Sequence, residues 1–436
     1  MSRAYDLKEH TLPNGLIVQT IRQPHLHSTT VSVYARVGSR HEAPTDNGLS
    51  HFLEHMFFRG SGTFPDSTAL NAAMEDLGGI LDGFTTRDYS GYQSTVHPST
   101  VEDAIGIFAD MFTSPRFDDI DIERSIILEE QLDALDDRGR DLDLDNLVHK
   151  AAFGDHPLSQ TVDGPRKNLK RFDHDDLHRH RERFYGAKNL VLTVAGKLEH
   201  DQIRRIARKA FRPLFEGQQA KEGRPPVMPA KSPKVRFVSS DDAQTRIRIV
   251  FRTVPSTHRD YPALLLIRRI LDGGLSARLQ VELVEKRGIV YEVGADHETY
   301  VDCGLFGFEL AVAHRKLAYA ITELARVLID LRTDGVQAHE LDRVRARSRI
   351  GLELGLDAPA ELAQWFGPTR LFHPPTTPET RMDELDAVTI TDMRRVIKKY
   401  LKPERMTVVG VGGANKTQIA EARKALKEMA SQLVQR

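Results

Sequence analysis

The stretch that decides both the fold and the chemistry of this chain is GLSHFLEHMFF, which runs from Gly48 to Phe58. Its centre reads H-x-x-E-H, with His51 and His55 at the ends and Glu54 before the second histidine. Residues three and four apart share one face of a helix, so two imidazoles can bind one metal ion while the carboxylate lies beside it. A bound metal acidifies water, and a neighbouring carboxylate can take the proton. The stretch therefore predicts a hydrolytic metal site.

The residues around this motif favour a buried helix. Asn47 or Thr45 is expected to cap its start, and Gly60-Ser-Gly62 is expected to end it. The motif is surrounded by apolar residues, namely Leu49, Phe52, Leu53, Met56 and Phe57. A buried helix that carries His, Glu and His on one side is costly unless something pairs with them. The context therefore favours a metal ion over three isolated polar side chains.

Composition limits the possible function classes. The chain has 436 residues, with 61 Lys and Arg against 62 Asp and Glu, so bulk binding to nucleic acid or to anionic membranes is not expected. Its single cysteine, Cys303, excludes a disulfide framework and a cysteine-rich zinc site. The first residues lack the apolar run of a secretory signal, and no apolar stretch reaches about 18 residues. We expect a soluble, cytoplasmic protein.

The two halves of the sequence repeat one pattern. Residues 172–196 match residues 388–412 without a gap at a shift of 216, and the same shift places strand 30–37 on 246–253. The stretch 218–233, rich in Pro, Lys and small residues, is typical of a linker. We therefore expect domains at 1–217 and 234–436, each α+β, with helices on one face of a mainly antiparallel sheet. Within the first, residues 16–21 and 30–37 are expected to pair as a hairpin.

The repeat also serves as an internal control. At the shift of 216, His51, Glu54 and His55 fall on apolar residues, Ile267, Ile270 and Leu271. Apolar side chains can thus occupy these helix positions in the same fold. We interpret the first half as the metal-binding copy and the second as a wall for the substrate.

Two histidines leave a zinc site one protein ligand short. An amphipathic helix expected at 119–135 offers Glu123, Glu129 and Glu130. Glu123 and Glu130 are two helical turns apart and project from the same face, but periodicity alone does not choose among the three. Because a charged helix is usually just solvated, only the upstream motif makes these residues candidates.

Five segments in order carry a resemblance to a known family: LPNGL, GLSHFLEHMFF, LGGILDGFTTRDY, ERSIILEE and EKRGIVY. Together they resemble the pitrilysin, insulinase and mitochondrial processing peptidase family, whose H-x-x-E-H order defines the inverzincins. The resemblance implies that His51, His55 and Glu130 bind Zn²⁺, that Glu54 is the general base, and that Glu123 orients the site. It also implies a zinc endopeptidase that acts on peptides or presequence-like segments. The length is similar to that of short bacterial-type members, in which each chain is half of a clamshell and two chains enclose a chamber.

The chain departs from the family at the strand that would hold the substrate. Many members have Asn-Ala-Tyr-Thr there, whereas this chain has Asp82-Gly83-Phe84-Thr85, shortly after Gly79. We expect these five residues to bind the substrate, the strand mainly through backbone groups.

A second departure concerns the pair Arg and Tyr that closes over the substrate carbonyl in active relatives. Tyr291 is present and is the expected catalytic partner, but Val284 stands where the arginine is expected, and Arg287 is not an obvious replacement. We therefore expect a heterodimer in which a homologous partner supplies the Arg–Tyr pair, with a homodimer as the other possibility. The alternative function is a non-catalytic, core-type assembly subunit, against which the intact ligand set argues.

Overall fold

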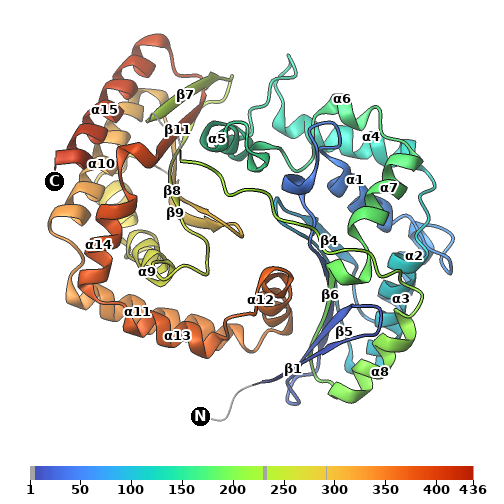
Figure 1. Cartoon of the computed structure of the whole chain (residues 1–436). Helices are drawn as coiled ribbons and strands as arrows, with labels where there is room; N and C mark the ends of the chain where they lie inside the picture. Colours follow the sequence, from blue (N-terminus) through green and yellow to red (C-terminus); the bar gives the residue numbers. More distant parts are fainter. Residues whose placement is uncertain (1–4, 229–232, 291, 436) are drawn as a thin grey trace. The chain divides into compact units, whose positions relative to one another are not determined.

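The computed structural model describes residues 5–228, 233–290 and 292–435. The chain forms two compact units that are not contiguous in sequence. Unit 1 comprises the segments up to Asp133, Gln160–Gly223 and Gly351–Thr377, and unit 2 comprises Ala134–Ser159, Arg224–Ile350 and the segment from Pro378 onward. Figure 1 labels many of the helices and strands of both units.

Unit 1 is built on a six-stranded sheet of order β1-β2-β6-β3-β5-β4. Only β2 and β6 run parallel, so the sheet is mainly antiparallel, as expected. Its strands are β1 (Asp6–Thr11), β2 (Ile17–Arg22), β3 (Thr29–Ala35), β4 (Asp82–Thr85), β5 (Ser90–Val96) and β6 (Leu190–Gly196). Because β4 pairs only with β5, it is an edge strand.

The expected hairpin between residues 16–21 and 30–37 is wrong. Strand β6 lies between β2 and β3, parallel to the first and antiparallel to the second. β6 is entirely buried and apolar apart from Thr193. A central position in the sheet, covered on both faces, therefore removes the most apolar surface from water. Local alternation in the sequence cannot reveal such an insertion from 150 residues away.

Helices cover both faces of this sheet. They are α1 (Leu49–Phe57), α2 (Ser67–Glu75), α3 (Val101–Thr113), α4 (Ile120–Glu130), α6 (Arg166–Leu169), α7 (His174–Phe184), α8 (His200–Ala210) and α12 (Pro359–Phe372). An apolar cluster joins Val33, Leu192 and Val194 of the strands to α1, α3, α7 and α8. Helix α12 packs on the other face, where Leu362 and Phe366 meet Ile21 and Ala195. Besides the expected helical face, the sheet therefore has a second covered face.

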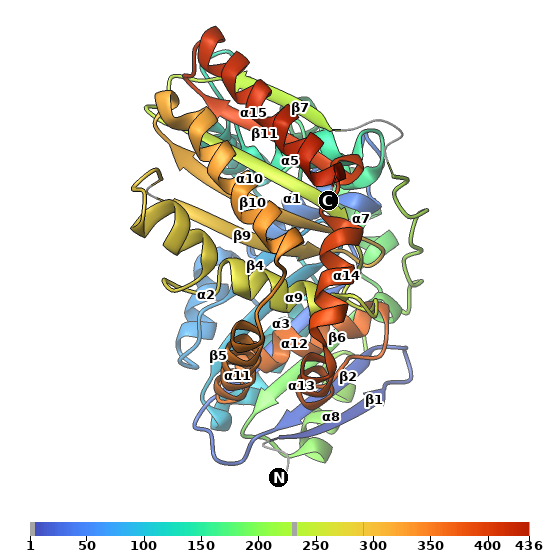
Figure 2. The ribbon, with the colours of Figure 1, turned by 90° about the vertical axis from the view of Figure 1, so that its left-hand side faces the viewer.

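Unit 2 holds a five-stranded sheet of order β7-β11-β8-β10-β9, in which only β7 and β11 run parallel. Its strands are β7 (Lys234–Ser239), β8 (Thr245–Thr253), β9 (Glu292–Thr299), β10 (Gly304–Val312) and β11 (Met406–Gly412). Its helices are α5 (Leu144–Phe153), α9 (Tyr261–Leu271), α10 (Leu317–Thr333), α13 (Pro378–Ala387), α14 (Ile390–Tyr400) and α15 (Lys416–Gln435), while α11 (Ala338–Gly355) leads back toward unit 1. Figure 2 shows α10 and α15 in front of this sheet.

The strand registers of the two sheets repeat at the shift of 216 residues. The pair Ala35↔Leu190 in unit 1 corresponds to Phe251↔Met406 in unit 2. The pair Ala35↔Ser90 likewise corresponds to Phe251↔Phe306. Helices α7 and α14 have bounds that differ by the same shift. The duplicated α+β architecture expected from the sequence is therefore present in strand order and in register.

The compact units differ from the contiguous domains expected from the sequence by an exchange of helices. Helix α5 belongs to the first half of the sequence but packs in unit 2, where Leu147 and Val148 meet Val250 and Val409. Its counterpart at the shift of 216, α12, belongs to the second half but packs in unit 1. Both helices present an apolar stripe, and sequence periodicity does not say which sheet will receive it.

The expected linker at 218–233 begins inside unit 1. Glu222 forms an ion pair with Arg36 at 3.1 Å, and the backbone of Ala220 donates to the side chain of Asn189. Residues 229–232 of this segment lie outside the described residues. In the part of the chain that the structure describes, the helices are all too short or too polar to cross a bilayer.

Candidate metal centre

Helix α1 is held at its N-terminus by a buried carboxylate. Glu42 accepts hydrogen bonds from the backbone of Gly48 at 2.8 Å and of Ser50 at 2.6 Å, and from the side chain of Asn47 at 2.9 Å. Gly48 precedes the helix with a φ of 105°, and a Cβ there would meet the carbonyl of Asp163. The helix is therefore capped by Glu42 and not by the expected Asn47 or Thr45. The carboxylate of Glu42 accepts hydrogen bonds from amides of the first turn, which have no partner within the helix.

His180 also supports α1, although its polar helix predicts exposure. Its Nε2 lies 3.0 Å from the hydroxyl of Ser50, the residue before His51, and its side chain is buried. Burial, with a smaller effect of nearby Arg183, lowers the pKa of His180 to about 3. The spacing of Leu177, His180 and Phe184 along α7 places His180 on the buried stripe, and this signal could have identified it.

The structure brings His51, His55 and Glu130 together. The Nε2 atoms of the two histidines are 3.3 Å apart, and Oε2 of Glu130 is 3.9 Å from the first and 3.8 Å from the second. Together with a carboxylate, two imidazoles are a donor set that zinc prefers. Glu129 is not part of this group of ligand atoms, which lie within 4.8 Å of one another, so the geometry separates two glutamates that periodicity left equivalent.

These residues fit a zinc ion. Zn–N bonds of about 2.0–2.1 Å in a tetrahedral site place two ligand nitrogens about 3.3–3.4 Å apart, which matches the separation of the two Nε2 atoms. Nδ1 of His51 is buried and lacks a hydrogen-bond partner among the described residues. Burial, followed by the neighbouring His55, lowers the pKa of His51 to about 3, so its ring is neutral and can offer a lone pair.

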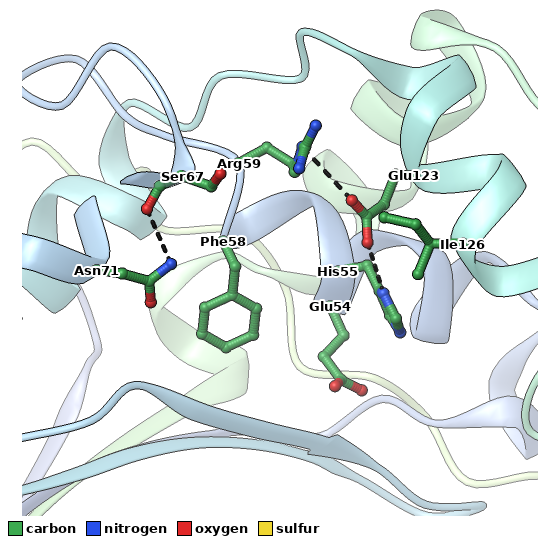
Figure 3. Close-up of a pocket in the computed structure, with 8 residues that line it drawn as sticks. All are labelled: Glu54, His55, Phe58, Arg59, Ser67, Asn71, Glu123 and Ile126. Atoms are coloured by element: carbon green, nitrogen blue, oxygen red, sulfur yellow. Dashed lines mark hydrogen bonds and ion pairs between the residues drawn. The ribbon is translucent and has the colours of Figure 1, made fainter. Parts of the chain in front are cut away.

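Glu123 orients the second imidazole. Its Oε1 lies 2.7 Å from Nδ1 of His55, and its other oxygen lies 3.4 Å from Nε of Arg59 (Figure 3). A carboxylate only accepts, so Nδ1 carries the proton and Nε2 directs its lone pair toward His51 and Glu130. Burial acts to lower the pKa of His55, but the bond to Glu123 and the charges of nearby carboxylates outweigh it and raise that pKa.

Glu54 is buried beside these atoms. It is 7% exposed, and its Oε2 accepts a hydrogen bond from the hydroxyl of Thr85 at 2.5 Å. Burial raises the pKa of Glu54 to about 7, against the opposing effects of Thr85 and His55. A Cβ at Gly83 would lie 2.7 Å from the ring of Phe58 and 3.3 Å from Oε1 of Glu54. Only glycine therefore lets β4 approach the helix this closely.

The five expected substrate-binding residues lie in and before β4. Gly83 and Thr85 face Glu54, whereas Asp82 is exposed and accepts from Gln93 at 3.1 Å. Phe84 is half-buried and packs on the face covered by α12. Gly79 is buried before the strand, where a Cβ would collide with Ser94. The unpaired edge of β4 leaves backbone groups available for an extended chain.

A cavity of about 320 Å³ opens next to Glu54 and His55. Phe58 and Ile126 supply apolar surface, and the ion pair Arg59–Glu123 also lines the cavity (Figure 3). Ser67 and Asn71 form the remaining side, where the amide of Asn71 donates to the backbone of Ser67. The cavity is thus a mixed apolar and polar pocket beside the candidate metal ligands.

Of the expected carbonyl-side residues, Val284 and Arg287 belong to unit 2, and Tyr291 lies outside the described residues. Val284 is in the helical turn Gln280–Glu285. Arg287 is engaged by two carboxylates: its Nη1 donates to Glu282 at 2.8 Å, and its Nε lies 2.9 Å from Glu323. Arg287 is therefore already neutralised within its own unit.

Comparison with known proteins places the chain in a family. Residues 17–166 match the family described as Insulinase (Peptidase family M16), and residues 171–348 match the Peptidase M16 inactive domain. The chain belongs to peptidase family M16. A protein of Mycobacterium tuberculosis named as an uncharacterized zinc protease is 31% identical over 90% of each chain. The Bacillus subtilis protein YmxG, also named as an uncharacterized zinc protease, is 26% identical over 81% of this chain and 85% of its own.

Solved structures agree on the fold. A protease from Helicobacter pylori has a TM-score of 0.86 at 21% identity and covers 93% of this chain and 99% of its own. A Pseudomonas fluorescens structure titled as a peptidase M16 inactive domain has a TM-score of 0.85 at 20% identity, with 94% and 98% covered. The expected family and fold class are thereby confirmed, and a zinc protease is the activity named for the relatives.

Proposed function

We propose that this protein is a zinc-dependent endopeptidase whose site consists of His51, His55, Glu130 and Glu54. The observation that carries the proposal is the convergence of two imidazoles and a carboxylate within 4.8 Å of one another. Beside them, Glu54 is buried and fixed by Thr85. The zinc proteases among the relatives support the same reading.

The chain's own residues divide the chemistry among them. A bound zinc would supply a Lewis acid that acidifies water and polarises the scissile carbonyl. Glu54 takes the proton from the attacking water and later passes it to the leaving amine, a role suited to a carboxylate buried beside the candidate ligands. Thr85 fixes the carboxylate of Glu54, and Glu123 fixes the ring of His55.

The substrate is proposed to be an extended peptide or presequence-like segment. Such a chain would add to the free edge of β4 through its backbone, with Gly83 leaving room beside Glu54. One of its side chains would enter the cavity lined by Phe58 and Ile126. This recognition needs an unfolded substrate, because a residue inside a folded sheet cannot donate its backbone to β4.

The active form is proposed to be a heterodimer that encloses the substrate in a chamber. Val284 offers no hydrogen-bond donor, and Arg287 would have to leave both Glu282 and Glu323 to act on a carbonyl. Losing one donor of this kind typically lowers turnover by about 10²–10³-fold. A homologous partner that carries an Arg–Tyr pair would restore it.

The test is peptidase activity on a quenched peptide library. Purified protein, Glu54→Gln and Glu129→Gln are compared with and without a chelator, alone and mixed with a homologous partner chain. We expect cleavage that needs zinc, Glu54 and the partner but not Glu129. Zinc-loaded protein that cleaves no peptide in any mixture would instead support the non-catalytic assembly subunit.

A further inference from the structure

Asp119 has a left-handed backbone conformation, which L-residues adopt rarely, although Asp and Asn tolerate it better than most. Its φ is 59° and its ψ is 28°, and among the described residues it is the only non-glycine residue with a positive φ. Asp119 stands directly before α4, but its side chain makes no capping hydrogen bond to that helix. The ordinary structural reason for an aspartate at a helix start is therefore missing.

The internal repeat shows how the same position is filled when no metal site follows. At the shift of 216, Asp119 corresponds to Gly335, which precedes α11 with a φ of 78°. Glycine adopts this conformation without strain, whereas in aspartate the Cβ atom comes close to the backbone and raises the energy of the conformation. The first half therefore keeps an unfavourable residue at a point where its own duplicate uses glycine.

The side chain of Asp119 begins a chain of contacts that ends at the metal ligands. Its Oδ2 lies 3.6 Å from Nη2 of Arg59, whose Nε lies 3.4 Å from Oε2 of Glu123. The other oxygen of Glu123 lies 2.7 Å from Nδ1 of His55. Figure 3 shows Arg59 and His55 on either side of the Glu123 carboxylate. Both Arg59 and Glu123 are largely withdrawn from solvent, with side-chain exposures of 17% and 7%.

The second half of the sequence lacks the residues that make this series of contacts. Glu123 corresponds to His339 and Glu130 to Ala346, and the turn after α9, residues 271–275, reads LDGGL and holds no basic residue. The fold is kept without any of these side chains. Their common presence in the first half therefore points to the metal site rather than to folding.

We propose that Asp119 and Arg59 are positioning residues of the zinc site, which act through Glu123 on His55. Arg59 follows the end of α1, and Asp119 and Glu123 belong to the start of α4. Their ion pairs join the helix that carries His51 and His55 to the helix that carries Glu130. Asp119 keeps this backbone conformation because its carboxylate pairs with the guanidinium of Arg59, which in turn pairs with Glu123. The inference rests on the proposed zinc site.

The experiment measures two quantities for each variant: the zinc dissociation constant, by competition with a chromophoric chelator, and the Tm of the metal-free protein. We expect Asp119→Gly to leave the Tm unchanged or raise it, because the strain is relieved, and yet to weaken zinc binding several-fold. Asp119→Asn, which tolerates the same backbone, should weaken zinc binding similarly. Arg59→Gln should weaken it by about 10–100-fold, the usual effect of losing a residue that orients a ligand, and Arg59→Lys should restore part of the loss.

The control is Asp121→Asn on the first turn of the same helix. Asp121 is 90% exposed and pairs with Arg124, so its removal changes the charge at the helix start without touching Arg59. We expect its zinc affinity to equal that of the unmodified protein. If Asp119→Gly lowers the Tm and leaves zinc affinity unchanged, Asp119 is a structural residue and the inference is wrong. If the unmodified protein binds no zinc that Glu130→Gln removes, the proposed zinc site itself fails.

Discussion

The hydroxyl of Thr85 on the edge strand lies 2.5 Å from Oε2 of Glu54 on the metal helix. This hydrogen bond joins the strand proposed to hold the substrate to the proposed general base. A hydrogen bond to a charged group contributes about 1.5–3 kcal/mol. We therefore expect Thr85→Val to lower kcat/KM by about ten- to a hundredfold while the Tm stays close to that of the unmodified protein. Thr85→Ser keeps the hydroxyl and should retain most activity; equal rates for both variants would contradict a role for this bond.

Metal analysis distinguishes two adjacent glutamates. Glu130→Gln should lower the zinc affinity by more than the roughly 10–100-fold typical of residues that only orient a ligand. The reason is that the carboxylate of Glu130 is the third donor of the cluster. Glu129→Gln is the matched control and should bind one zinc normally. Dialysis against a chelator followed by elemental analysis measures both, and zinc retained by Glu130→Gln would exclude it as a ligand.

The carboxylate that caps α1 should be needed for stability. Glu42 accepts from Gly48 and Ser50 inside the protein. Glu42→Gln keeps the size of the side chain but replaces one of the two accepting oxygens by an NH₂ group, which can only donate. We therefore expect the free energy of unfolding to fall by about 1–3 kcal/mol. Denaturant titration measures it. An unchanged unfolding midpoint would show that the first turn of α1 needs no anion.

Burial of His180 gives the protein an acid-sensitive stability. Its folded pKa of about 3 lies below the value of about 6.5 in an unfolded chain, so below that pH the unfolded chain binds a proton that the folded protein excludes. The stability contribution is thus complete above about pH 6.5 and is lost as the pH falls toward 3, at up to about 1.4 kcal/mol per pH unit. His180→Gln should flatten the decline in unfolding free energy between pH 7 and pH 5. Parallel curves for both proteins would refute the assignment.

The partner hypothesis predicts a gain of function. If the carbonyl-side donor is missing, Val284→Arg should raise the partner-free kcat/KM by about 10²–10³-fold. Arg287→Lys, which keeps the charge beside Glu282 and Glu323, should leave the rate unchanged. Loss of activity in Arg287→Lys, with no gain from Val284→Arg, would identify Arg287 as the donor instead.

The sequence predicted the features that are encoded locally. H-x-x-E-H placed its three side chains on one face of a short helix, and the repeat predicted two sheets of one pattern. The contributions of Glu42, His180, Arg59 and Asp119 were missed because each depends on where distant segments meet. The left-handed backbone of Asp119 is a case in point: in the sequence it is only the second of two adjacent aspartates, and its partner Arg59 lies about 60 residues earlier, in the turn after α1.

The exchange of α5 and α12 has a consequence for how the chain folds and breaks. Each half of the sequence carries the helix that completes the other half's sheet, as in a domain swap between two copies that have become one chain. Neither half can bury its own sheet before the other has been synthesised, so we expect the two halves to fold together and a fragment ending near residue 217 to aggregate. For the same reason, a protease cut between the halves should leave a nicked protein that stays whole until it is denatured.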